Sequence, residues 1–135
     1  MSLEIAKEFA SMIDTGRYDE ATQLLSDSCE YTYSEGKYQG RENIIFIYRM
    51  NDRESKKLFD EVSYASEVEP TDDGKFRINF VDSLRKGRSW HKVRSFQVLQ
   101  IEEGQIASIH HYEIPGEIES LRAFYGRATA EMNIS

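Results

Sequence analysis

The sequence is poor in residues that form cross-links and in positive charge. Cys29 is the only cysteine, which excludes an internal disulfide and a cysteine-based zinc site and favours a reducing compartment. Lys and Arg number 17 against 24 Asp and Glu, for a formal net charge of -7, and the basic residues are scattered along the chain. We therefore expect no nucleic-acid partner and no anionic membrane partner.

Long apolar runs are also missing. The first ten residues, MSLEIAKEFA, contain two glutamates and no uninterrupted apolar core of the kind found in signal peptides. No later stretch approaches the length needed to span a bilayer. These features predict a cytoplasmic protein.

The composition is otherwise that of an ordinary globular protein. The chain has 135 residues, of which 39% are hydrophobic and 12% aromatic. A fold of this size buries enough surface to be stable without metals or disulfides. We expect a single domain over residues 1–135.

The first half of the chain has mainly helical periodicity. Apolar residues recur at three- and four-residue spacing in residues 2–14, and a shorter helix is predicted with Asp19 as its N-cap. Residues 29–33 read as a strand and EGKYQG as a loop. A further helix is predicted over residues 41–57.

The second half alternates with a period of two. Strands are predicted over residues 58–68, 76–84, 90–102 and 105–114, separated by turns at PTDDGK, Lys86–Arg88 and Glu103-Gly104. Helical spacing returns in residues 118–125. Helices followed by long hairpins predict an α+β fold, in which amino-terminal helices pack into the concave face of a curved antiparallel sheet and enclose an apolar pocket.

Two segments carry a resemblance to a known family. GKYQGRENIIFIY contains a small-residue loop at positions 40–42, and VLQIEEGQIASIHHYE contains a Gly-Gln-Ile turn at positions 104–106. With the order of predicted elements, they resemble the nuclear transport factor 2-like superfamily, in particular its SnoaL-like branch. The resemblance implies a cone-shaped sheet (a cystatin-like α+β roll) around a hydrophobic pocket, often in a homodimer. Isomerases, cyclases, dehydratases, epoxide hydrolases and non-catalytic binding modules share this fold, so the resemblance does not choose a function.

The positions that match the catalytic residues of ketosteroid isomerases are mostly replaced. The oxyanion-hole tyrosine falls on Phe9, the aspartate base on Tyr33, and the second oxyanion donor near Phe96. Only Tyr48 keeps a matching helix tyrosine. Without a carboxylate base at these positions, that isomerase chemistry is not expected.

Limonene-type epoxide hydrolases resemble residues 78–121 more closely. The segment FVDSLR places one catalytic aspartate of that family on Asp82. The family's arginine falls on Phe80, its second aspartate on Ile114, and its water-binding asparagine on Thr32. In SnoaL-like cyclases, an aspartate near the end of the last strand matches Glu113 only if the register slips by one residue.

Asp82 is the carboxylate that strand alternation places among apolar residues. It shares the even positions of its strand with Phe76, Ile78, Phe80 and Leu84. Burial of a carboxylate on such a face disfavours ionisation and can produce an acid or base poised near neutral pH. A structural role near a solvated strand end remains the alternative.

The last hairpin sets the direction of the histidines. A two-residue turn at Glu103-Gly104 pairs Gln97 with His110 and leaves one face without formal charge. If that face is the interior, Gln97, His110 and Tyr112 point into the pocket. His111 and Glu113 then point outward with Trp90 and Phe96, on a surface that a second copy of the chain would cover.

These directions predict a site. We expect Asp82 and His110 to be its proton-transfer groups, because a carboxylate can hold a neutral imidazole as a general base. No cofactor is predicted, and metal binding by His91 and His110 is disfavoured. A small apolar ligand would contact Gln97 and the ring-bearing residues Tyr31, Tyr33, Tyr48, Tyr64 and Tyr112.

Two functions remain open from the sequence. One is an enzyme, such as an isomerase, cyclase or hydratase, that uses general acid–base catalysis on a small molecule. The other is a non-catalytic homodimeric ligand-binding or interaction domain, which the substitutions at known catalytic positions favour.

Overall fold

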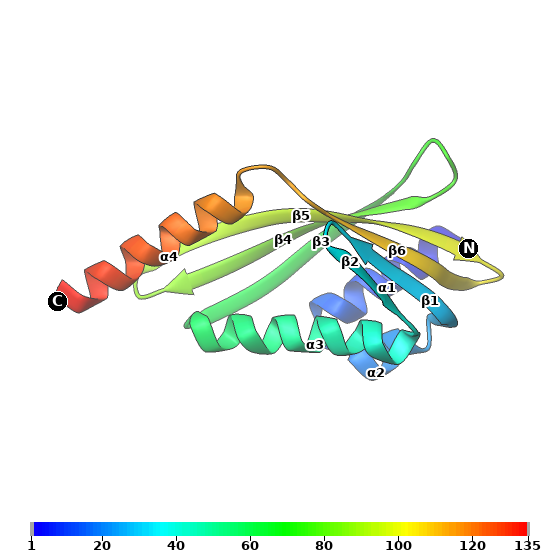
Figure 1. The fold of residues 1–135 in the computed structure, drawn as a ribbon, viewed down its shortest axis with the longest axis horizontal. Helices are drawn as coiled ribbons and strands as arrows, with labels where there is room; N and C mark the ends of the chain where they lie inside the picture. The colour runs from blue at the N-terminus through cyan, green and yellow to red at the C-terminus, as the bar shows by residue number, and fades with distance from the viewer. Residues whose placement is uncertain (1, 135) are drawn as a thin grey trace.

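The structure is a computed structural model that describes residues 2–134, with side chains described for residues 2–132. Its elements follow in the order α1 (Ser2–Asp14), α2 (Tyr18–Thr22), β1 (Leu25–Tyr33), β2 (Gly36–Gln39), α3 (Arg41–Leu58), β3 (Glu61–Pro70), β4 (Phe76–Lys86), β5 (Ser89–Glu102), β6 (Gln105–Glu113) and α4 (Glu117–Ile134). The α+β fold class is confirmed. Figure 1 shows the long hairpins running the length of the molecule, with α3 below them and α4 at one end.

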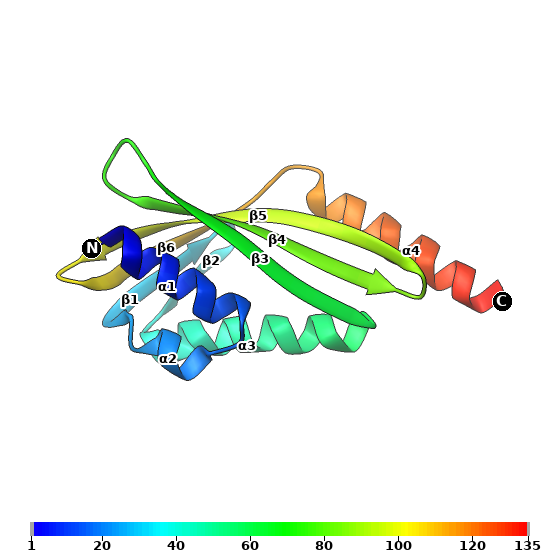
Figure 2. The ribbon, with the colours of Figure 1, turned by 180° about the vertical axis from the view of Figure 1, so that it is seen from behind.

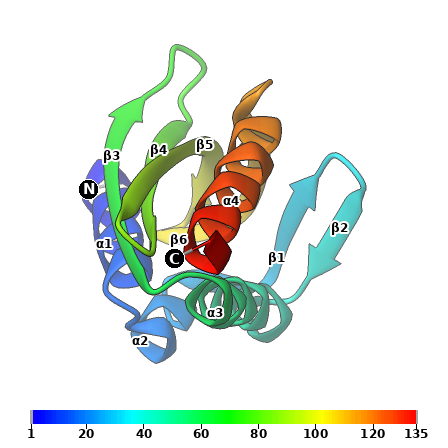
Figure 3. The same cartoon turned by 90° about the vertical axis from the view of Figure 1, so that its left-hand side faces the viewer.

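The described strands form one six-stranded sheet in the order β2-β1-β6-β5-β4-β3. It is curved and unclosed, with β1 and β2 turned away from β3 (Figure 3). Neighbouring strands are antiparallel except for β1 and β6, which run parallel. The sequence predicted antiparallel neighbours throughout, and it predicted the segment that forms β2 as a loop. The strand β1 lies between the edge strand β2 and β6.

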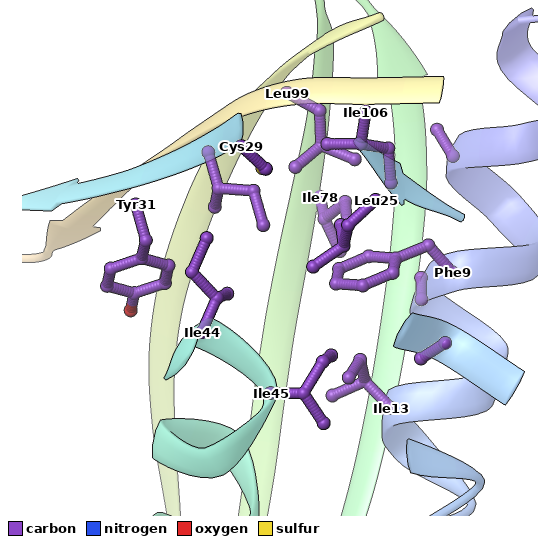
Figure 4. Packing of buried hydrophobic residues seen from close by; sticks show 14 of the residues in the cluster. Phe9, Ile13, Leu25, Cys29, Tyr31, Ile44, Ile45, Ile78, Leu99 and Ile106 are labelled. Atoms are coloured by element: carbon purple, nitrogen blue, oxygen red, sulfur yellow. The ribbon is translucent and has the colours of Figure 1, made fainter. Parts of the chain in front are cut away.

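The amino-terminal helices pack on the concave face, as predicted. The helix α1 packs against β3 and β4, and α3 packs against β1. Figure 2, the view from behind Figure 1, shows α1 in the foreground beside β3. In Figure 4, Phe9 of α1 and Ile44 of α3 point toward the sheet residues Ile78 and Leu99, and all four are fully buried. Burying these side chains provides most of the driving force for this part of the fold.

A second apolar cluster attaches the C-terminal helix. Phe124 and Ala128 of α4 are buried with Phe59 and Leu84, and the ring of His91 stacks on Phe124. The predicted final helix is therefore confirmed and extends to Ile134. None of the described helices combines the length and the apolar character that a membrane crossing requires.

A β-bulge in β6 determines which residues face the concave side. The turn at Glu103-Gly104 is the predicted two-residue turn, with φ of 51° and 78°, and Ile101 pairs with Ile106. Gln100, however, pairs with Ser108. One extra residue in β6 reverses the alternation of every residue that follows it.

Candidate functional site

A pocket of about 320 Å³ lies between α1, α3 and the concave face of the sheet. This volume is at the lower end of the range for small-molecule sites, roughly 300–1,000 Å³. Its lining is dominated by aromatic residues and carboxylates. The tyrosines are Tyr18, Tyr31, Tyr33, Tyr38, Tyr48 and Tyr64, and the carboxylates are Asp14, Asp52, Asp82 and Glu113.

One end of the pocket is a hydrogen-bond network around Gln97, which is only 3% exposed. Tyr48 donates its hydroxyl proton to Gln97 Oε1 over 2.6 Å. The amide nitrogen of Gln97 lies 3.4 Å from the Tyr31 hydroxyl and 3.3 Å from His111 Nδ1. The amide carbonyl and both amide protons thus have partners, as a buried side chain requires.

This network also determines the tautomer and the charge of His111. An acceptor role for Nδ1 toward the Gln97 amide places the imidazole proton on Nε2. Burial lowers the pKa of His111 from its ordinary value of 6.5, so the ring is neutral at neutral pH. Burial also raises the pKa of Tyr48 well above its ordinary value, which keeps that phenol a donor. We call Tyr31, Tyr48, Gln97 and His111 the network end.

The opposite end of the pocket is acidic. Asp82 of β4 pairs across the sheet with Tyr64 of β3, and Tyr64 donates its hydroxyl proton to Asp52 Oδ1 over 2.7 Å. Asp14, the last residue of α1, accepts a hydrogen bond of 2.5 Å from Ser66. We call Asp14, Asp52, Tyr64 and Asp82 the acidic end.

Two carboxylates at the acidic end are poorly compensated. Burial, and secondly the charge of Asp14, raise the pKa of Asp82 to about 6. Burial also raises the pKa of Asp14, against the effect of the Ser66 hydrogen bond. The Oδ1 atom of Asp14 is buried without a hydrogen-bond partner among the described residues. Burial therefore destabilises the charged form of both carboxyls, and no group in the described chain fully compensates for this effect.

Cations near the pocket are already paired. Lys56 forms an ion pair of 3.1 Å with Asp52. Arg49 pairs with Asp19 and lies over the ring of Tyr18. Among the described residues that line the pocket, none is Lys or Arg. In that same part of the chain, no group of three His, Cys, Asp or Glu side chains is arranged to hold a metal ion.

Solved structures share this architecture. An NTF2-like protein of unknown function from Cytophaga hutchinsonii superposes with a TM-score of 0.64 at 14% identity, over 88% of this chain and 95% of that one. A ketosteroid isomerase-like protein from Catenulispora acidiphila, crystallised with trimethylamine, gives 0.64 at 16% identity over 87% and 90%. The epoxide hydrolase/cyclase-like enzyme SalBIII gives 0.65 at 15% identity over 84% and 91%. The chain has the nuclear transport factor 2-like fold. No protein-family model and no curated protein sequence matches it.

Most of the predicted site residues line the pocket of this NTF2-like fold. They are Asp82, Gln97, Tyr31, Tyr33, Tyr48 and Tyr64. Their roles stay predictions, because lining a pocket does not assign a function.

His110 and Tyr112 do not line the pocket, so the predicted direction of both side chains is wrong. They are exposed and stack on each other on the opposite face of the sheet, where Tyr112 also stacks on Phe96. The bulge in β6 is the reason, since it places His111 and Glu113 inside instead. The directions predicted for β5 are correct, because no irregularity precedes them.

The predicted pairing of a carboxylate with an imidazole is therefore absent. His111 does not replace His110 in it, because Asp82 pairs with Val93 while His111 pairs with Gln97. Those two β5 residues are four positions apart, about 13 Å along a strand. The acidic end and the network end are separate groups.

Sequence reasoning missed several lining residues. Asp14 follows the buried Ile13 at the end of α1, and only the packing of this helix on β3 brings it to Ser66. Asp52 extends the α3 face that carries Tyr48, four residues earlier, so helical periodicity could have identified it. Tyr18 and Tyr38 complete the aromatic lining.

Proposed function

We propose that this domain binds a small organic molecule in the concave pocket. The observation that carries the proposal is a partly enclosed space of about 320 Å³ that combines aromatic walls with separate polar groups at two ends. Aromatic rings provide apolar contact area, while the polar groups fix the orientation of a ligand. The C. acidiphila neighbour holds trimethylamine, and SalBIII is described as acting in pyran ring formation. Both support small-molecule binding as a use of this fold.

A fragment screen by ligand-observed NMR tests this function. The pocket-filling variant Ser95→Phe adds a ring at a partly buried lining position, whereas Ala65→Phe adds the same ring at an exposed position of β3. We expect fragments that bind the wild type and Ala65→Phe but lose binding to Ser95→Phe. Equal binding to all three proteins, or no binding to the wild type, would contradict the proposal.

A second candidate function is proton transfer by Asp82 to or from the bound molecule. It is favoured by the position of Asp82, which lines the pocket and has no hydrogen bond or ion pair among the described residues. Burial raises the pKa of this carboxyl to about 6, which suits it to accepting and returning a proton near neutral pH. Asp82 would accept a proton from a carbon next to a carbonyl group, while the electron pair of the C–H bond moves toward the carbonyl oxygen. Return of the proton completes the cycle without another reactant.

Deuterium exchange tests this second function directly. Ketone fragments that bind the pocket are incubated with the protein in D₂O, and loss of the C–H signal is followed by NMR. We expect the rate to rise as the pH passes about 6 and to fall on the order of 100-fold or more in Asp82→Asn. The control Asp27→Asn changes an exposed aspartate paired with Arg41. Exchange that persists in Asp82→Asn would leave binding as the function.

We also propose that the outer face of the sheet pairs with a second copy of the chain. Trp90 and Tyr112 are 51% and 40% exposed there, and Arg77 lies 3.7 Å over the ring of Phe96. Light scattering coupled to size-exclusion chromatography should give the mass of a dimer for the wild type and of a monomer for Tyr112→Glu. A monomeric wild type would exclude this arrangement.

A further inference from the structure

The uncompensated negative charge of the pocket points to the class of its ligand. Four carboxylates line the pocket, and only Asp52 is paired with a cation, Lys56. Among the described residues, Asp82 has no hydrogen bond or ion pair, and Asp14 is bonded only to Ser66. Glu113, at the exposed rim, adds a further negative charge. The pocket therefore disfavours an anionic ligand.

The geometry of Asp14 provides an independent indication. Its Oδ1 atom is buried and has no hydrogen-bond partner in the described chain, although the residue lines the pocket. A buried acceptor of this kind is costly unless a donor reaches it. Asp14 also ends α1, whose last turn contains no basic residue, so the partial negative charge of the helix C-terminus adds to that of the carboxylate.

The aromatic rings around the acidic end also favour a cationic ligand. Tyr18, Tyr64 and Phe80 line this part of the pocket. The electron-rich faces of aromatic rings attract cations, and the attraction increases when water is excluded. The Tyr64 hydroxyl donates to Asp52, so its proton is not available to an anionic ligand.

We propose that the pocket binds a protonated organic amine, with the ammonium group held by Asp14 and Asp82 and the carbon skeleton packed against the tyrosines. This inference rests on the proposed binding function and specifies the charge of the ligand. The N–H groups of the ammonium would donate to Asp82, and the negative charge of Asp14 would add to the attraction. The network end would contact the far end of the molecule, where its polar groups already satisfy one another.

Three probes of equal size and different charge test the proposal by isothermal titration calorimetry at neutral pH. They are benzylamine, which is cationic, benzyl alcohol, which is neutral, and benzoate, which is anionic. We expect benzylamine to bind at least about tenfold more tightly than benzyl alcohol, and benzoate to bind more weakly than both. Added salt should weaken benzylamine binding most.

Matched variants assign the effect to the two carboxylates. Asp14→Asn and Asp82→Asn should each reduce benzylamine affinity about tenfold while changing benzyl alcohol affinity less than about twofold. Asp82→Asn removes a poorly compensated buried charge, so this variant is expected to fold. Circular dichroism checks the fold of Asp14→Asn, whose amide must keep the acceptor that Ser66 uses. Asp27→Asn, which alters an exposed aspartate outside the pocket, should bind all three probes as the wild type does.

The outcomes separate this inference from the function on which it rests. Equal or tighter binding of benzyl alcohol or benzoate, or unchanged benzylamine affinity in both pocket variants, would overturn the amine assignment. Fragments found in the NMR screen would then still support a binding pocket. If none of the three probes binds, the amine assignment is overturned, and a negative screen would reject the binding function as well.

Discussion

The two ends of the pocket handle buried polarity in opposite ways. At the network end, the Gln97 amide is matched by partners from β1, α3 and β6. At the acidic end, Asp82 has no such partner, and one oxygen of Asp14 is unsatisfied among the described residues. A satisfied network stabilises the fold, whereas uncompensated charge weakens it and is retained where a ligand makes use of it. From this difference we infer that the network end is structural, and the acidic end is the part that our proposal assigns to ligand binding.

The largest expected effect is at the network end. Gln97→Leu removes the partner of the Tyr48 hydroxyl and of His111 Nδ1 while keeping an apolar side chain of similar size. We expect a loss of about 2–4 kcal/mol in the free energy of unfolding, measured by urea denaturation. Gln39→Leu, at an exposed position of β2, serves as the control. A loss in Gln97→Leu no greater than in the control would show that the network contributes no stability.

Removing a charge at the acidic end should increase the stability of the protein. In the unfolded chain the Asp82 carboxyl has its ordinary pKa of 3.8, and in the folded protein about 6. The stability contributed by the protonated form is therefore full below pH 4 and is lost as the pH rises through about 6. Asp82→Asn keeps the side chain neutral, so we expect a gain of about 2 kcal/mol at pH 8 and almost none at pH 4.

Urea denaturation at both pH values measures this gain. Asp27→Asn provides the comparison, because its exposed carboxylate is paired with Arg41 and its removal should give no gain at pH 8. If Asp82→Asn is less stable than the wild type at pH 8, the carboxylate is compensated and the contrast between the two ends fails.

A smaller loss is expected from a single hydroxyl of the network. Tyr48→Phe removes the donor to Gln97 Oε1 and keeps the ring that packs edge-on against Phe9. We expect a destabilisation of about 1 kcal/mol in thermal or urea unfolding. Tyr112→Phe, on the exposed outer face, should change stability little. If Tyr48→Phe loses as much stability as Gln97→Leu, the whole stabilisation by the network comes from this one hydrogen bond.

The smallest effect should come from Ser66→Ala, which removes the hydrogen bond that Asp14 accepts. Loss of this donor should raise the pKa of Asp14 further and cost roughly 0.5–1 kcal/mol at pH 8, with less lost at low pH. Ser63→Ala, at an exposed position of the same strand, is the matched control. Equal stability of the two variants at pH 8 would show that Ser66 does not support Asp14.

Much of the fold could be predicted from local periodicity. The bounds of α1 match the prediction, and the directions of Gln97 and Asp82 followed from alternation in β5 and β4. These features depend on short-range patterns that the sequence displays directly. The outward direction of Phe96 followed from the same alternation.

The misassigned features depend on long-range packing or on a local irregularity. Nothing in the sequence of β6 distinguishes Ala107 as an extra residue, so His110 and His111 were assigned to the wrong faces. The parallel pairing joins β1 to β6, two strands that lie far apart in the sequence. The position of Asp14 beside Ser66 joins residues 52 positions apart, which no local pattern reveals.

The bulge in β6 also defines a second register that the strand does not adopt. If Ala107 paired with Gln100 instead of bulging out, every later residue of β6 would move by one position along β5 and change face. His110 and Tyr112 would then face the interior in place of His111 and Glu113, and the pocket would lose one carboxylate and the acceptor for Gln97. A single unpaired residue thus fixes the chemistry of the cavity while the surrounding scaffold keeps its shape.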